Sequence, residues 1–188
     1  NDVKKDAIVS SQYLLVEGYL VTSGHTKDAA LHSLDIATDN NIKKIITLSD
    51  PNIVNFFKKD MLELVSKKFD IIFCNRQEAL NISSENDINS AMNFLKQYSK
   101  EVVITSGSEG AYASDENEYV HIPSKIANPV DLTGAGDMFL AAYMSAKIKN
   151  KTLTERINFS NECAAKIIEK YGAKFDSDIE YQNLLSIL

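Results

Sequence analysis

The stretch Asp131–Phe139 reads Asp-Leu-Thr-Gly-Ala-Gly-Asp-Met-Phe and packs two glycines and two carboxylates into seven residues. The residues that follow it, LAAYMSAKI (140–148), favour a helix that is apolar on nearly every side. Asp137 therefore lies at the N-terminal end of a helix that the pattern predicts to be buried. A charged side chain at such a place is uncommon unless it is paired or has a chemical task.

Outward from this stretch, short apolar runs alternate with helical patterns. The runs predict strands at 13–20, 44–49, 70–75 and 101–107, helices at 26–41, 50–68, 76–80, 84–98 and 152–172, and a hairpin at 110–123. Such alternation is typical of a parallel sheet covered by helices. We therefore expect an α/β fold of three layers, α/β/α, with a mostly parallel sheet, the hairpin at its edge, and residues 1–188 forming a single domain.

Capping residues predict several helix ends. Ser84 and Asp87 stand three apart in the order of a capping box, with Asp in place of the usual Glu or Gln. Thr152 or Thr154 is the expected N-cap of the last predicted helix, and Gly172 its expected stop.

Composition and charge exclude several classes of function. With 188 residues and 44% hydrophobic content, the chain can bury one sizeable core. A formal charge of −6 argues against a nucleic acid or an anionic membrane as partner. Cys74 and Cys163 lie in apolar segments without metal-ligand spacing, so we interpret them as buried thiols in a reducing compartment. No apolar run approaches the roughly 20 residues that span a bilayer, and a soluble, cytoplasmic protein is expected.

Polar or glycine residues mark the ends of two predicted strands and the start of the apolar helix. Asn75 follows the third predicted strand, Gly107 ends the fourth, and Gly134–Asp137 open the helix. Ligands of open α/β sheets collect at the carboxyl ends of strands and at helix N-termini. We expect these three junctions to lie close together.

The glycines of the opening stretch do not fit the common nucleotide loops. A dinucleotide fingerprint needs a third glycine where the chain has Phe139, and Asp137 would repel the pyrophosphate. The phosphate loop G-x-x-x-x-G-K-[ST] is absent. In a phosphoryl transferase, Gly134-Ala135-Gly136 would supply backbone N–H groups to an anion, and Asp137 would be the base. Alternatively, the glycines pack tightly against a strand and Asp137 caps the helix; the spacing leaves both interpretations open.

Four stretches together resemble one known family. DLTGAGDMF (131–139) resembles the second signature of the ribokinase-like (pfkB) sugar and nucleoside kinases. In the family's order, NRQE (75–78) is similar to its Asn-x-x-Glu motif, TSG (105–107) to its Thr-x-Gly nucleotide loop, and SNECAAKIIEKYGA (160–173) to its C-terminal helix beside the adenine pocket. The resemblance implies a ribokinase-like fold and the transfer of phosphate from ATP to a sugar or nucleoside hydroxymethyl group.

Roles for particular residues follow from the resemblance. It implies that Asp137 is the catalytic base and that the backbone N–H groups of Gly134, Ala135, Gly136 and Asp137 form an anion hole. Asn75 and Glu78 would organise Mg²⁺ through water around the ATP phosphates. Without the resemblance, these two residues have an ordinary alternative, in which Asn75 ends a strand and Glu78 lies on an exposed turn.

The resemblance assigns further residues to the nucleotide and the acceptor. Thr105 and Gly107 would touch the nucleotide, Asn161 would lie near adenine, and Asp131 would lie towards the acceptor or a monovalent cation. The alternatives are a strand threonine, a solvent-facing helix asparagine and a loop aspartate before a turn. His25, His32 and His121 fit no part of this machinery and are expected to be surface or edge residues.

The sequence also departs from the family's pattern. Leu132 stands where the family usually carries a small or hydroxyl residue, and nothing in the chain matches the Gly-Gly signature or the lid strands that begin such kinases. We therefore expect the C-terminal, nucleotide-binding portion of such a kinase, with weak ATP binding, little activity alone, and an exposed edge that favours a homodimer. Three rivals stay open: a kinase of vitamin-like alcohols such as pyridoxal or hydroxymethylpyrimidine, a non-catalytic nucleotide-binding or scaffold module, and an α/β domain without a ligand.

Overall fold

The structure, a computed structural model, describes residues 3–188 and contains alternating strands and helices. The strands are β1 Tyr13–Glu17, β2 Lys43–Thr47, β3 Phe69–Asn75, β4 Ser99–Thr105, β5 Ala111–Ser114 and β6 Tyr119–Ile122. The α-helices are α1 Lys5–Val9, α2 Gly24–Asp39, α3 Pro51–Phe56, α4 Lys58–Val65, α5 Arg76–Ser83, α6 Ile88–Leu95, α7 Ala135–Ile148, α8 Leu153–Ile167 and α9 Asp178–Leu185. Two short 3-10 helices, η1 Gly18–Thr22 and η2 Gly107–Glu109, complete the order.

The strands follow one another across the sheet in the order β1-β2-β3-β4-β5-β6. The β1–β2 and β2–β3 pairs are parallel, with Val16 opposite Ile46 and Ile46 opposite Ile72. These three side chains are almost completely buried, because strands covered by helices carry apolar residues through their length. The mostly parallel sheet that the sequence predicts is confirmed.

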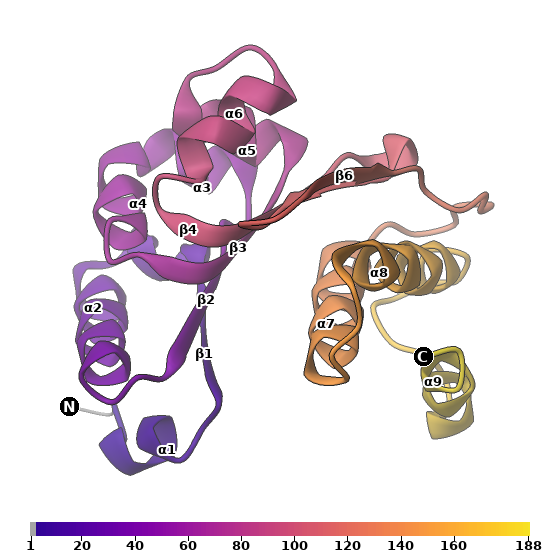
Figure 1. Cartoon of the computed structure of the whole chain (residues 1–188), viewed down its shortest axis with the longest axis horizontal. Helices are drawn as coiled ribbons and strands as arrows, with labels where there is room; N and C mark the ends of the chain where they lie inside the picture. Colours follow the sequence, from indigo (N-terminus) through magenta and orange to yellow (C-terminus); the bar gives the residue numbers. More distant parts are fainter. Residues whose placement is uncertain (1–2) are drawn as a thin grey trace. The chain divides into compact units, whose positions relative to one another are not determined.

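The chain divides into two compact units, and most of the sheet belongs to the first. Unit 1 comprises residues 1–104 and 114–116. In it, α2 and α4 lie along one side of β1–β3 (Figure 1). Ala30, Leu34 and Ala37, which the sequence places on one stripe of α2, are all buried.

Unit 2 comprises residues 105–113 and 117–188. Here α7 and α8 pack side by side (Figure 1), and their core joins Ala142, Ala146, Phe159 and Cys163 to Leu184 of α9. Both cysteines of the chain are buried and free, as predicted. The prediction of a single domain over residues 1–188 stays a prediction.

Some predicted boundaries are wrong. Ser84 is not the N-cap of the following helix but the left-handed C-cap of α5, and Asp87 alone caps α6 by accepting from the Ser90 N–H. The predicted helix 50–68 is two helices separated at Phe57, whose backbone leaves the helical region. Thr152 caps α8 as predicted, but α8 ends at Ile167, before Gly172.

Helices α1 and α9 have no counterpart in the prediction. For α9 the signal was present, because Ser177 and Glu180 form a capping box at its start. Among residues 3–188, no helix is both long enough and apolar enough to cross a membrane.

Candidate functional site

Helix α7 begins at a glycine that no other residue can replace without strain. Gly134, the N-cap, has φ of 81°, in the left-handed region. A Cβ at this position would lie 2.6 Å from the Cβ of Ala173, so the space is also closed to a side chain. Gly134 is therefore closely packed, but its neighbour is Ala173 and not a strand, so the interpretation that the glycines pack against a strand is wrong.

The second glycine of the motif has the opposite surroundings. Gly136 has no atom within 4 Å of the place where a Cβ would stand, and its φ is not positive. Glycine costs helix stability at such a place, and the protein itself does not require one there. The open space leaves the backbone of α7 accessible to a bound group.

The first turn of α7 exposes N–H groups that have no partner. The Ala135 N–H donates to the Leu132 carbonyl, but the N–H groups of Gly136 and Asp137 find no acceptor anywhere in residues 3–188. Gly134 offers no side chain to cap them. Free N–H groups at the positive end of a helix form a favourable site for an anion.

Asp137 does not cap this helix. It occupies position N3 of α7, its side chain is exposed, and it makes no hydrogen bond or ion pair within the described chain. The acidic N3 residues of α5, α8 and α9 behave differently, because each closes a capping box with its N-cap: Glu78 with Asn75, Glu155 with Thr152, and Glu180 with Ser177. The helix-capping alternative for Asp137 is therefore wrong, and its carboxylate is available for another contact.

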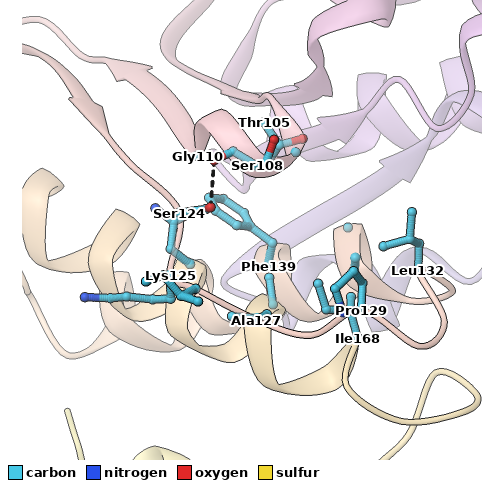
Figure 2. A pocket seen from close by; sticks show the side chains of 17 residues that line it. Thr105, Ser108, Gly110, Ser124, Lys125, Ala127, Pro129, Leu132, Phe139 and Ile168 are labelled. Atoms are coloured by element: carbon cyan, nitrogen blue, oxygen red, sulfur yellow. Dashed lines mark hydrogen bonds between the residues drawn. The ribbon is translucent and has the colours of Figure 1, made fainter.

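A pocket of about 670 Å³ lies within unit 2, beside the start of α7 (Figure 2). Ala135, Gly136 and Phe139 form one wall. The rest of the lining comes from three segments. They are α8 with its C-cap (Asn161, Ala164, Ala165 and Ile168), the end of β4 with the loop after it (Thr105, Gly107, Ser108 and Gly110), and the segment after β6 (Ser124 to Ala127, Pro129 and Leu132). A mostly apolar pocket with a few polar groups is typical of small-molecule sites.

The residues predicted for the nucleotide meet in this pocket. Thr105, Gly107 and Asn161, which are far apart in the sequence, all line it together with Ala135 and Gly136. Asn161 is buried rather than solvent-facing, and its Nδ2 donates to the carbonyls of Ile122 and Pro123 at 3.1 Å each. The alternative of a solvent-exposed asparagine is therefore wrong.

Asp131 ties the motif to the segment after α8. Its Oδ1 accepts from the Thr133 N–H and its Oδ2 from the Gly172 N–H, both at 2.9 Å. Hydrogen bonds from Thr133, with that from the Gly172 N–H, lower the pKa of Asp131. The carboxylate thus holds the loop that carries Gly134. This contact favours the loop alternative for Asp131, and its predicted role towards the acceptor or a cation stays a prediction.

Asn75 and Glu78 belong to unit 1 and form a closed pair. The Asn75 N–H donates to Glu78 Oε2 at 2.9 Å, Asn75 Nδ2 donates to Oε1 at 2.6 Å, and the Glu78 N–H donates back to Asn75 Oδ1. Glu78 is only 3% exposed, so the exposed-turn alternative is wrong. Burial raises the pKa of Glu78 to about 7, hydrogen bonding from the Asn75 N–H opposes the rise, and the nearby Asp50 carboxylate adds to it.

Sequence reasoning missed Asp50 as part of this group. Asp50 follows β2, the strand next to β3, and accepts the N–H groups of Asn52 and Ile53 at the start of α3. The Asp-Pro pair after a buried strand was the available signal. Within residues 3–188, no set of three or more His, Cys, Asp or Glu side chains is arranged to hold a metal ion. A cation at Glu78 would need water or a ligand to complete its shell.

Known proteins resemble this chain over nearly its whole length. A family model described as pfkB family carbohydrate kinase matches residues 1–180. The chain belongs to the pfkB family. The ribokinase-like α/β fold and the family predicted from the sequence are thereby confirmed.

One curated relative and two solved structures show how similar known proteins are to this chain. The ribokinase of Staphylococcus aureus is 27% identical over 177 residues, which cover 90% of this chain and 54% of that protein. The crystal structure of adenosine kinase from Sinorhizobium meliloti has a TM-score of 0.89 at 28% identity and covers 98% of this chain and 57% of that one. A ribokinase II candidate from E. coli, solved with ATP and Mg²⁺, has a TM-score of 0.86 at 20% identity, covers 99% of this chain and 62% of that one, and shares the fold. The chain thus spans a little over half the length of these proteins.

Proposed function

We propose that this pfkB chain forms the nucleotide-binding part of a kinase that transfers the γ-phosphoryl group of ATP to a hydroxymethyl group of a sugar or nucleoside. The similarity to a ribokinase and to an adenosine kinase supports this acceptor class. The observation that carries the proposal is the start of α7, next to the pocket, where a carboxylate and two N–H groups have no hydrogen-bonding partner among residues 3–188.

The pocket chemistry fits a nucleotide. Its walls of alanine, isoleucine and phenylalanine side chains suit the faces of a base, and Thr105 and Asn161 add polar groups to the lining. The phosphates would extend towards the N–H groups of Gly136 and Asp137, since a helix N-terminus favours negative charge. The missing side chain of Gly136 leaves room for that approach.

Asp137 would act as the general base. The acceptor hydroxyl would lose its proton to the Asp137 carboxylate as its oxygen attacks the γ-phosphorus in line, and the bond between the γ-phosphorus and the β–γ bridging oxygen would break, so that ADP leaves. The N–H groups of α7 would stabilise the negative charge on the phosphate oxygens. The exposed, unpaired state of Asp137 is what this role requires, because a carboxylate locked in a capping box could not accept the proton.

Mg²⁺ is implied by the family, and one part of the chain fits it. Glu78 is a buried carboxyl group beside the carboxylate of Asp50, with a raised pKa, and a divalent cation would stabilise its charged form. Bound there through water, as the resemblance to the family implies, Mg²⁺ would supply positive charge that stabilises phosphate oxygens. Asn75 keeps both Glu78 oxygens oriented by its two hydrogen bonds.

A non-catalytic nucleotide-binding module is the second candidate. The observation in its favour is the pocket itself, because a mostly apolar lining with a few polar groups can bind a ligand without any transfer step. Such a module would use the pocket and the N–H groups of α7. It would have no need of an unpaired carboxylate at N3.

Calorimetry with Mg-ATP, followed by a transfer assay, tests the proposal. The protein should bind Mg-ATP, and Gly136→Val should abolish binding by filling the open space, whereas Gly24→Val, at an equally open position of α2 in unit 1, should leave binding unchanged. In a kinase that contains this chain, labelled γ-phosphate should then pass to pentoses, hexoses or nucleosides that keep the hydroxymethyl group and not to analogues that lack its hydroxyl. Binding without transfer to any acceptor would favour the module, and no binding would refute both.

A further inference from the structure

The loop that forms the rim of the pocket is held by two side chains of the neighbouring segment. His121 of β6 contacts the Glu109 carbonyl with its Nε2 at 2.9 Å. The Ser124 Oγ donates to the Ser108 carbonyl at 2.8 Å (Figure 2). A carbonyl oxygen only accepts, so the imidazole must carry a proton on Nε2 and donate it. Both bonds fix the backbone of η2, the 3-10 turn between Thr105 and Gly110.

A stacked aromatic ring fixes the orientation of this donor. The His121 ring lies on Tyr112 of β5, with ring centres 4.0 Å apart and planes 6° from parallel. Without the stack, an exposed imidazole would turn about its side-chain bonds and lose the Glu109 carbonyl for part of the time. Tyr112 therefore supports the hydrogen bond without making it.

The other end of the segment is anchored to α8. Asn161 donates to the carbonyls of Ile122 and Pro123, the residues that directly follow His121. At Gly110 the rim loop meets the same segment so closely that a Cβ would lie 2.1 Å from the Ile122 carbonyl oxygen. A continuous set of contacts thus runs from α8 through the end of β6 to η2, and it sets the separation of two walls of the pocket.

We propose that His121 is a positioning residue for the nucleotide: through Glu109 it holds the rim loop 105–110 at the distance from α8 that the bound nucleotide needs. The inference rests on the proposed function insofar as the pocket takes a nucleotide. His121 does not itself line the pocket, so it acts through η2 alone.

Three substitutions separate the hydrogen bond from the stack. His121→Phe keeps an aromatic ring on Tyr112 and removes the donor. His121→Gln keeps an N–H donor without the ring. Tyr112→Leu removes the aromatic ring on which His121 stacks and leaves the imidazole in place. His25→Phe, at an exposed histidine of α2 in unit 1, is the matched control.

The first readout needs no ligand. Hydrogen exchange at the Glu109 and Gly110 amides, whose N–H groups donate to Ser106 and Gly107, should be faster in His121→Phe and in Tyr112→Leu, partly restored in His121→Gln, and unchanged in His25→Phe. Unchanged exchange in His121→Phe would overturn the proposal whether or not the protein binds ATP.

The second readout is the Kd for Mg-ATP, measured by calorimetry. Losing one exposed hydrogen bond should raise it about 2- to 10-fold in His121→Phe, with His121→Gln nearer to the wild type. Faster exchange with an unchanged Kd, or a lower melting temperature alone, would reduce His121 to a structural residue and overturn the proposal. If the wild-type protein itself fails to bind Mg-ATP, the proposed function fails, and the exchange data still decide whether His121 holds the loop.

Discussion

Asp137 and Glu78 occupy the same position, N3, of two helices, and their surroundings differ in every respect. Glu78 is buried, accepts two hydrogen bonds from its own N-cap residue, Asn75, and closes the helix start. Asp137 is exposed, has a glycine as its N-cap, and is paired with nothing in residues 3–188. The Asn75 N-cap holds the Glu78 carboxylate with its side-chain amide as well as its backbone N–H, whereas Gly134 offers a backbone N–H alone, which Asp137 does not contact in residues 3–188.

The largest expected effect concerns the free carboxylate. Asp137→Asn should lower the rate of phosphoryl transfer about 10²- to 10⁴-fold, the usual contribution of a general base. The Kd for Mg-ATP and the melting temperature should change little, because the side chain makes no hydrogen bond or ion pair with the described part of the chain.

The matched control for this substitution is Glu155→Gln, at the locked N3 position of α8. It should leave the transfer rate unchanged and lower the melting temperature slightly, because Glu155 closes the box with Thr152. Equal transfer rates for Asp137→Asn and the wild type would mean that Asp137, like Glu155, takes no part in phosphoryl transfer.

The contribution of the Glu78 carboxyl group to the free energy of unfolding should depend on pH. Glu78 has a pKa of about 7 in the folded protein, against 4.5 for the ordinary group, so its contribution to stability is present below pH 4.5 and is lost as the pH rises through 7. The Glu78→Gln variant should not show this loss of stability, because glutamine does not titrate. Chemical unfolding from pH 4.5 to 8 should therefore show the wild type losing up to about 3 kcal/mol relative to the variant.

Adding Mg²⁺ provides a second test of the Glu78 site. If the ion binds at Glu78, it should raise the unfolding midpoint of the wild type at pH 8 and not that of Glu78→Gln, since binding to the native state stabilises it. A stability difference that does not vary with pH would mean that the carboxyl group is not held as the structure places it.

The two glycines of the α7 start should separate stability from binding. Gly134→Ala forces a Cβ to within 2.6 Å of Ala173 at a φ of 81°. The free energy of unfolding should therefore be about 1 to 3 kcal/mol lower than in the wild type. Gly136→Ala meets open space and should raise stability by about 0.5 to 1 kcal/mol through helix propensity, while weakening Mg-ATP binding. Denaturant titration and calorimetry measure the two quantities. A stable Gly134→Ala protein would contradict the close packing.

The smallest expected effect is at a helix start without a proposed function. Thr152→Ala removes the N-cap side chain of α8 and should cost about 1 kcal/mol of stability. Its Kd for Mg-ATP should equal that of the wild type. A marked loss of ATP binding in this variant would mean that helix ends in general, and not the α7 start in particular, control the pocket.

Much of the fold could be read from the sequence because its signals are local. Buried strands such as β3 have an apolar run bounded by turn residues, and the stripe of α2 gives a clear helical period. The boundary at Ser84 could not be read in the same way. Ser84 fits an N-cap by residue type, but its left-handed backbone, which ends α5, depends on conformation and not on composition.

The candidate site was predictable only in part. The motifs identify Asp137, Thr105, Gly107 and Asn161, and the last three meet in one pocket. Burial of Glu78, its coupling to Asp50 and the hydrogen bond of His121 to Glu109 depend on contacts between segments distant in the sequence or on the depth of a side chain. No local pattern encodes those properties, and residue types alone assigned Glu78 to the surface and His121 to no role.

The most direct test of the central claim is an NMR titration of the amide groups of Gly136 and Asp137 with Mg-ATP. If the start of α7 receives the phosphates, these two amides should show the largest shifts in the protein and become protected from solvent exchange, because they now donate to phosphate oxygens. In Asp137→Asn the same shifts should persist while phosphoryl transfer is lost. Binding of Mg-ATP that leaves both amides unshifted and exposed would contradict the account.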